Sequence, residues 1–299
     1  MDLTRYVNTF GKAMRQKHGC KVHKVSINAA FTCPNRDATK GIGGCTFCNN
    51  ASFNVNAQNA PTIDQQLCEG KAVVGRKKNA SKFIAYFQAY TSTYGDVALL
   101  EQRYEQALRT PDVVGLSVGT RPDCVPDEVL RLLARYQEQG HEVWLELGLQ
   151  SANDEVLRQV NRGHDVACYK DAIKRAKSFG LQVCTHLIVG LPGETPEATI
   201  DAAAMATDHN SDGLKIHPLH VVKGTQMARQ LKLGEIPPLS QEQYVDVVTR
   251  IIRQAPDEQT FHRLTGTANE QLLLAPGWCQ RKWSVLNAIY HRLATCPAT

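Results

Sequence analysis

The sequence lacks several features that would assign it to a common class of protein. It contains no uninterrupted apolar run of about 18 residues, so no membrane-spanning helix and no membrane partner are predicted. Its beginning, MDLTRYVNTFGKAMRQKHG, mixes charges with glycine where a secretory signal peptide has an apolar stretch. No nucleophile elbow, phosphate loop or carboxylate pair at catalytic spacing is evident. These absences predict a cytoplasmic protein and argue against the enzymes that such motifs define.

The composition is that of an ordinary globular protein. Of the 299 residues, 42% are apolar and 21% are charged, which argues against long disordered segments and against a fibrous protein. The 34 Lys and Arg residues outnumber the 29 Asp and Glu residues and give a formal net charge of +5. A charge of this size permits binding to nucleic acid but does not by itself indicate it.

The ten cysteines are the unusual feature of the composition. A cytosolic chain cannot be assumed to hold them in disulfides, so some are expected to bind a metal or to take part in chemistry. Those in apolar or helical contexts are predicted to be small buried side chains. They are Cys68, Cys168, Cys184 and Cys296.

Short β-branched segments alternate with longer amphipathic ones along the first 225 residues. Helices are predicted over 126–140, 165–180 and 195–210, the last two with Asp165 and Thr195 as N-caps. After the first gap, the strands recur roughly every 30 to 40 residues, the length of a βα unit with a right-handed crossover. This pattern predicts an α/β fold with parallel strands, but it does not distinguish a barrel from a doubly wound sheet. The strands are predicted near Val25, Phe83, Val114, Val143, Val183 and Leu214.

The pattern changes after about Met227. A connector rich in Pro and Gly is followed by a predicted helix over 240–254 and by a candidate strand over 259–266. No Gly- or Ser-rich linker separates an independent domain. We therefore expect one α/β core, residues 1–225, with a C-terminal helical extension, residues 226–299, packed on it.

Three cysteines in the segment CPNRDATKGIGGCTFCN form the strongest motif. Eleven residues separate Cys33 from Cys45, and two separate Cys45 from Cys48. A Cys-x2-Cys pair places two thiolates on one metal or cluster, and a third thiolate from across a loop completes the set. Three thiolates on a four-iron cluster leave one iron open for chemistry. A zinc site with Cys20 as the fourth ligand is the alternative that the spacing alone leaves open.

These residues resemble the radical SAM superfamily, whose members hold a [4Fe-4S] cluster with three cysteines on a strand-to-helix loop. The long first gap departs from the usual Cys-x3-Cys-x2-Cys and resembles the branch that contains the elongator catalytic subunit. Within that branch, CPNRD and GGCTFCN are similar to the YhcC-like family. The resemblance covers about residues 20–225, and more weakly the rest. It implies a partial (β/α)6 TIM-type barrel, the cluster on Cys33, Cys45 and Cys48, and S-adenosylmethionine (SAM) as the second cofactor.

The resemblance also implies which residues bind SAM. The segments AYTSTYG, ELGLQS, NRGHD and THLIVGLPGET occur in the order of the family's SAM-binding motifs, each at the end of a successive strand. Related enzymes use an equivalent Gln and Arg for the ribose and the methionine carboxylate, a pairing that suits a guanidinium. The implied cofactor-binding residues are Phe47, Tyr90, Thr91, Gln150, Arg162, His186 and Ile188.

The resemblance implies an enzyme that cleaves SAM reductively to a 5′-deoxyadenosyl radical, with a reducing partner such as flavodoxin or ferredoxin. Elongator kinship implies a tRNA substrate modified at wobble uridine. Basic residues near the N terminus, at 76–78 and beside Trp278 and Trp283 are compatible with RNA but equally with solvated charge. A small metabolite or a partner protein remains an alternative substrate, and a zinc-stabilised binding module an alternative to catalysis.

Four further residues stay ambiguous in the sequence. Cys124 follows a predicted strand end and is either a hydrogen donor to the radical or an ordinary thiol. Glu146 either contacts SAM or substrate inside the barrel or pairs with an arginine. His217 and His220 bracket the end of the sixth strand and are either substrate contacts or structural histidines.

Overall fold

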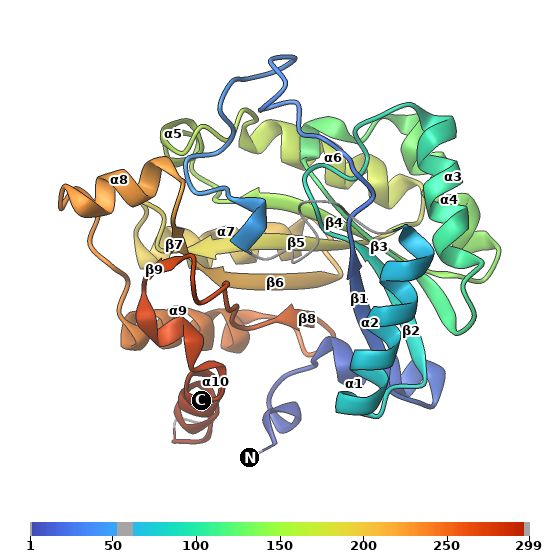
Figure 1. Cartoon of the computed structure of the whole chain (residues 1–299). Coiled ribbons are helices and arrows are strands. Elements are labelled where there is room, and N and C mark those ends of the chain that lie inside the picture. Colours follow the sequence, from blue (N-terminus) through green and yellow to red (C-terminus); the bar gives the residue numbers. More distant parts are fainter. Residues whose placement is uncertain (1, 53–61, 296–299) are drawn as a thin grey trace.

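The computed structural model describes residues 2–52 and 62–295 of the chain. In this part the main sheet has seven parallel strands in the order β1-β2-β3-β4-β5-β6-β8, and β7 pairs antiparallel with β9. The sheet is curved into a partial barrel, which confirms the α/β prediction (Figure 1). The strands are β1 (Val22–Ile27), β2 (Lys82–Phe87), β3 (Val113–Thr120), β4 (Glu142–Gln150), β5 (Gln182–Val189), β6 (Gly213–Pro218), β7 (Val221–Val222), β8 (Thr260–Arg263) and β9 (Leu273–Ala275).

The seventh strand of the barrel, β8, comes from the segment predicted as a C-terminal extension. It is the candidate strand over 259–266, and it pairs in parallel with β6. The division of the chain near residue 225 remains a prediction about domains, but the barrel sheet itself continues past it.

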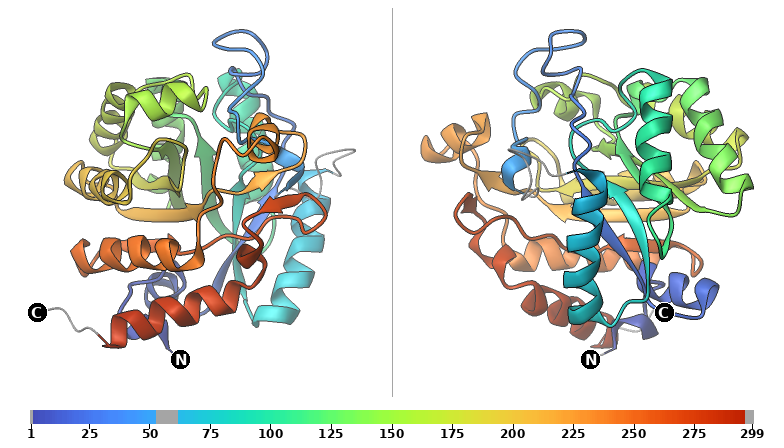
Figure 2. Two further views of the ribbon diagram at one scale, coloured as in Figure 1. Left: turned by 90° about the vertical axis from the view of Figure 1, so that its left-hand side faces the viewer. Right: turned by 45° about the vertical axis from the view of Figure 1, so that its right-hand side comes forward.

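The helices that connect successive parallel strands cover the outer face of the sheet, where crossover connections place them (Figures 1 and 2). The predicted N-caps are confirmed: the Asp165 carboxylate accepts from the Cys168 amide at 2.8 Å, and the Thr195 hydroxyl accepts from the Ala198 amide at 3.1 Å. The helices are α1 (Phe10–His18), α2 (Ile63–Lys78), α3 (Val97–Leu108), α4 (Asp127–Glu138), α5 (Asp154–Gln159), α6 (Val166–Ser178), α7 (Pro196–Asp208), α8 (Gln226–Lys232), α9 (Gln241–Gln254) and α10 (Lys282–Thr295), with 3-10 turns at Leu3–Arg5, Asn50–Ser52, Pro122–Cys124 and Gly277–Gln280.

Helix α1 closes the barrel at the amino ends of the strands. It contacts both β1 and β8, the two edges of the sheet. The Phe261 amide donates to the Asn8 carbonyl at 2.8 Å, so the chain before α1 extends the β8 edge. Phe10 and Met14 pack against Trp144 inside the barrel and exclude water from its lower end. The interior is therefore closed at the amino ends of the strands.

Two predictions about individual cysteines are affected. Cys184 is buried as predicted, but Cys68 is exposed because it lies on the outward face of α2. Cys168 is half-buried. Cys296 lies outside the described residues.

Candidate functional site

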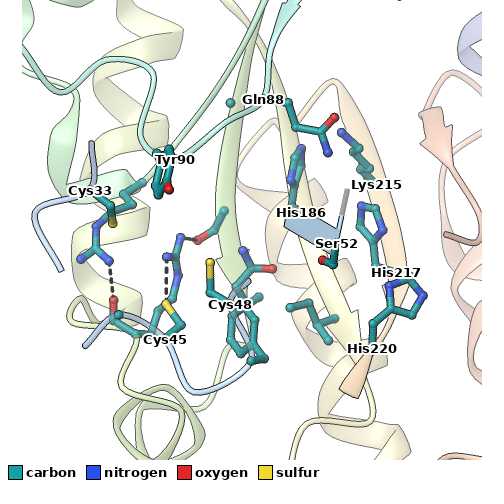
Figure 3. A pocket seen from close by; sticks show the side chains of 18 of the residues that line it. Cys33, Cys45, Cys48, Ser52, Gln88, Tyr90, His186, Lys215, His217 and His220 are labelled. Atoms are coloured by element: carbon teal, nitrogen blue, oxygen red, sulfur yellow. Dashed lines mark hydrogen bonds between the residues drawn. The ribbon is translucent and has the colours of Figure 1, made fainter. Parts of the chain in front are cut away.

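A cavity of about 240 Å³ opens at the carboxyl ends of the barrel strands (Figure 3). Every residue to which the sequence assigned a cofactor lines it, although these residues come from five separate segments of the chain. They are Cys33, Cys45, Phe47, Cys48, Tyr90, Thr91, Gln150, Arg162, His186 and Ile188. The specific role of each in ligand binding remains a prediction.

The loop after β1 carries the three thiols to one side of the cavity (Figure 3). The Cys48 amide donates to the Cys45 carbonyl at 2.9 Å, which makes the Cys-x2-Cys segment a tight turn. Gly44 has a φ of +78°, and a Cβ there would meet Arg36 Nε at 2.8 Å. Glycine is thus needed at this position both for the backbone conformation and for the close packing of Arg36.

The surroundings of the thiols fit a thiolate-bound cluster. Arg162 Nη1 donates to Cys45 Sγ at 3.6 Å, and Asn35 Nδ2 donates to the same sulfur at 3.8 Å. Hydrogen bonds of this kind to cysteine sulfur tune Fe–S clusters. Burial raises the pKa of the Cys48 thiol to about 11, and neighbouring Cys45 adds to this effect. Cys48 would therefore bind as a thiolate only beside a positive charge that stabilises it, such as the iron of a cluster.

The zinc alternative finds no support in the positions of the cysteines. Cys20 precedes β1 and Cys33 follows it, and six strand residues span about 20 Å. Among the described residues, no three His, Cys, Asp or Glu side chains are grouped for a single metal ion.

Two residues on the cavity wall have strained backbones. Tyr90 has a φ of +59° and Gln150 a φ of +77°, in the left-handed region that non-glycine residues rarely occupy. Gln150 also lies at a register shift between β4 and β5. Such strain concentrates at ligand-binding sites, where the surrounding structure holds it. Its presence at two positions assigned to SAM supports that assignment.

Polar atoms without partners also point to ligands in this cavity. Thr91 Oγ1 and Arg162 Nε are buried, and neither has a hydrogen-bond partner within the described structure. The rest of the Arg162 guanidinium is held in place, because Nη2 donates to the Gly148 carbonyl at 2.7 Å. Buried polar groups are normally paired, so unpaired ones in a cavity are expected to meet a ligand or water.

Below the cavity, a buried ionic cluster crosses the barrel. Glu146 on β4 accepts from Lys215 on β6 at 2.8 Å and pairs with Lys24 on β1. The carboxylate of Glu146 also contacts His186 Nε2 at 2.6 Å and accepts from the Ser117 hydroxyl. Lys215 also donates to the Tyr86 hydroxyl. The expected arginine partner of Glu146 is therefore replaced by two lysines.

Neither lysine of this cluster was predicted from the sequence as a site residue. Lys24 and Lys215 stand in strands that bury apolar residues, VHKVSI and GLKIHP, at positions that face the barrel interior. A charged residue inside an apolar strand is unusual because an unpaired buried charge is costly. Such a residue indicates a buried ion pair, but the sequence does not show its partner, because Glu146 is 69 residues away from Lys215.

The cavity lining is strongly cationic. Five arginine and lysine residues line the cavity, and no Asp or Glu is among the described residues that line it. Two of the five pair with a carboxylate in the described structure: Arg121 binds Asp123 through two 2.9 Å contacts, and Lys215 binds Glu146 at 2.8 Å. The cationic residues are Arg36, Arg121, Arg162, Lys215 and Arg263. A lining of this kind suits anionic ligands.

The remaining ambiguous residues divide into two groups. His217 and His220 both line the cavity. Cys124 is buried and does not line it, and burial raises the pKa of its thiol to about 12. The structure therefore favours the ordinary buried thiol over a hydrogen donor at this position.

We expect the stability of the protein to fall between pH 7 and pH 5. Five histidines have their pKa values lowered by burial, several to about 3 or 4, so they stay neutral while unfolded histidines protonate below about pH 6.5. They are His164, His186, His217, His220 and His262. Glu194 opposes them, because burial raises its pKa to about 7 and the folded state gains one proton.

The unfolded state thus binds about four more protons, five minus one, and acid favours it. The measurement is the Tm of the anaerobically purified holoenzyme at pH 7, 6 and 5. A Tm that stays level or rises toward pH 5 would contradict the neutral-histidine assignment.

No helix in the described part of the chain is long and apolar enough to cross a membrane.

Comparison with known proteins agrees with this geometry. Residues 32–206 match the radical SAM superfamily, and residues 211–295 match the Radical SAM C-terminal domain. Protein YhcC of Escherichia coli K12 is 47% identical over 284 residues, which cover 95% of this chain and 91% of that protein. The uncharacterized protein YtqA of Bacillus subtilis is 39% identical and covers 96% of this chain and 89% of its own length. The resemblance to the YhcC-like family is therefore confirmed.

Elongator proteins match over a shorter part of their length. Elongator complex protein 3 of Schizosaccharomyces pombe is 31% identical over 154 residues, 50% of this chain and 28% of that protein. The structure of the archaeal elongator protein 3 from Methanocaldococcus infernus, with residues 1–46 deleted, has a TM-score of 0.67 at 19% identity. It is matched over 92% of this chain and 63% of its own, and this likeness shows a shared fold.

A family match across more than half of the chain, with relatives at 47% and 39% identity across nearly all of it, shows that the protein belongs to the radical SAM superfamily, whose enzymes use a [4Fe-4S] cluster and SAM as cofactors.

Proposed function

We propose that this radical SAM enzyme modifies a tRNA, at a wobble uridine. The observation that carries the proposal is the position of the cationic cavity beside a basic, aromatic surface on the rim of the barrel. The elongator relatives support the same substrate class. When bound, the cluster and SAM supply a 5′-deoxyadenosyl radical that abstracts hydrogen from an unactivated carbon.

The residues of this chain would hold and shield those cofactors. Cys33, Cys45 and Cys48 would bind the cluster, and the Arg162 guanidinium would bind the methionine carboxylate of SAM. Gln150, Tyr90, Thr91, Phe47, His186 and Ile188 would surround the rest of SAM. Helix α1, which closes the lower end of the barrel, and the ionic cluster beneath the cavity would exclude water from the reacting carbon. A flavodoxin or ferredoxin would deliver the electron.

A second pocket of about 380 Å³, the side opening, adjoins the main cavity between the edges of β1 and β8. It is lined by Ser26 of β1, Arg263 of β8 and the loop after β8, and it shares Ser52, Gln88 and Arg263 with the main cavity. Lys282, at the start of α10, lies on its rim. The adjacent Trp283 side chain is 69% exposed. A cation beside an exposed indole suits a single-stranded nucleotide, which binds by charge and stacking.

The two other basic segments lie away from this opening. Lys17 is at the end of α1, below the barrel, where its ammonium contacts Glu142 at 2.6 Å. Arg76 lies in the last turn of α2, just before the amino end of β2. Because the cavity is at the opposite ends of the strands, these residues are not expected to contact an RNA substrate that reacts there.

We predict that Trp283→Ala with Lys282→Gln weakens tRNA binding by about tenfold or more, because it removes one stacking surface and one cation. The measurement is the binding of unmodified tRNA to the anaerobic holoenzyme at several salt concentrations. The matched control is Arg15→Gln with Lys17→Gln on α1, which should change affinity little. Equal losses in both variants would mean general charge attraction and would contradict a site at this rim.

The second arm compares the modified nucleosides of tRNA from cells with and without the gene. Loss or replacement of one wobble uridine derivative is the expected result. Unchanged nucleosides, together with no salt-dependent tRNA binding, would overturn the proposal in favour of a small metabolite or a partner protein as substrate.

A further inference from the structure

The wall of the cavity formed by β5, β6 and β8 differs from the wall that carries the thiols. His186, Lys215, His217 and His220 lie on it, and Figure 3 shows them grouped apart from Cys33, Cys45 and Cys48. Arg263, the last residue of β8, lines both the cavity and its side opening. None of the motifs that indicated the cluster and SAM includes Lys215 or Arg263.

Positive charge exceeds negative charge on this wall. Glu146 is the carboxylate of the buried cluster, and it already pairs with both Lys24 and Lys215. Arg263 adds a third cation, and within the described residues its guanidinium has neither a carboxylate nor a hydrogen-bond acceptor. An arginine stays charged under all ordinary conditions, so the excess cannot be removed by loss of its proton.

Burial, together with this excess of positive charge, lowers the pKa values of basic residues near Arg263. Burial lowers the pKa of Lys215 to about 8; Arg263 and Lys24 lower it too, although Glu146 opposes them. Burial also lowers the pKa values of His217 and His220, with Arg263 contributing to both. These histidines are therefore neutral near pH 7.

The wall is also rigidly built. Lys215 is fixed between Glu146 and the Tyr86 hydroxyl. The loop after β8 packs closely on the histidines, because a Cβ at Gly266 would meet His217 Nδ1 at 2.9 Å and His220 Cε1 at 3.3 Å. The fixed ammonium of Lys215, the fork of Arg263, which is unpaired within the described residues, and the neutral imidazoles together offer donors to an incoming anion.

We propose that Arg263 and Lys215 form an anion-binding subsite, which takes a carboxylate or phosphate group of the substrate and holds it across the cavity from the thiols. The guanidinium of Arg263 matches the planar geometry of either group in a bidentate contact, and Lys215 supplies the second charge. The subsite rests on the proposed function in one respect, that the substrate reacts in this cavity. It does not require that the substrate be RNA.

The test measures anion binding by the anaerobic holoenzyme with SAM at saturation, so that the Arg162 side of the cavity is already filled. Inorganic phosphate and acetate are titrated separately by calorimetry. We expect Arg263→Gln to raise the Kd of the bound anion about ten- to hundredfold, the range for loss of a charge-assisted pair. Arg263→Lys, which keeps the charge but not the fork, should give a smaller rise.

The matched control is Arg229→Gln, at an exposed arginine on α8 that does not line the cavity. It should leave the Kd unchanged. Because Arg263 has no partner to lose in the described structure, Arg263→Gln should keep the Tm of the wild-type protein, which separates a binding defect from misfolding.

Binding of phosphate alone would assign the subsite to a nucleotide phosphate, and binding of acetate alone to a carboxylate of the substrate. If neither anion binds, or if both bind wild type and Arg263→Gln within twofold, the proposal is overturned. Unchanged tRNA nucleosides in the deletion strain, together with anion binding that depends on Arg263, would refute only the proposed tRNA function. Altered tRNA nucleosides in the deletion strain, together with no anion binding, would refute only the proposed subsite.

Discussion

Cys45→Ala is expected to abolish reductive cleavage of SAM. Cys45 is the most enclosed of the three thiols, 8% exposed, and its sulfur accepts hydrogen bonds from both Arg162 and Asn35. Removing it leaves two thiolates to hold the cluster and takes one acceptor away from both donors. We expect iron content to fall and 5′-deoxyadenosine production to drop by at least about a thousandfold, or about 4 kcal/mol in the barrier.

The matched control is Cys68→Ala, the same change at an exposed cysteine on the outside of α2. It should keep both iron and activity. Brown, iron-loaded Cys45→Ala protein that cleaves SAM normally would refute the ligand assignment. Colourless wild-type protein, purified anaerobically with about one zinc per chain, would refute the cluster itself.

The thiols could be found in the sequence because their pattern is local. Cys33, Cys45 and Cys48 lie on one loop, so their spacing alone limits what they can bind. The order of the SAM motifs was equally accessible, since parallel strands bring their carboxyl ends to one edge. Periodicity also predicted the seven strands of the barrel sheet, including the one that became β8, but not the short pair β7 and β9.

The ionic cluster could not be found in this way. Glu146 meets Lys24, Ser117, His186 and Lys215, which stand on four other strands. Which side chains meet inside a barrel depends on strand tilt and register, and these are set by the closed sheet rather than by any one segment. The positions of the basic segments could not be predicted either, because a run of charged residues does not indicate which end of the barrel it occupies.

Glu146→Gln is expected to destabilise the protein more than other single changes outside the thiol loop. Burial alone would raise the pKa of this carboxyl, but Lys215 and Lys24 hold it well below its usual value, so the group is ionised. The variant leaves two buried ammonium groups without a counter-charge. Breaking a buried ion pair from one side costs about 3–5 kcal/mol, which should lower the Tm by roughly 5–10 °C.

The matched control is Glu142→Gln, on the same strand. That carboxylate is also buried, but its partner Lys17 is 56% exposed and can be solvated by water, so the expected cost is about 1–2 kcal/mol. Adding Lys215→Met to Glu146→Gln removes one of the stranded charges and should recover part of the lost Tm. Equal effects of the two single variants, or no recovery in the double variant, would show that Glu146 does not balance the lysines. Recovery would show that charge balance between Glu146 and the two lysines stabilises the floor of the cavity.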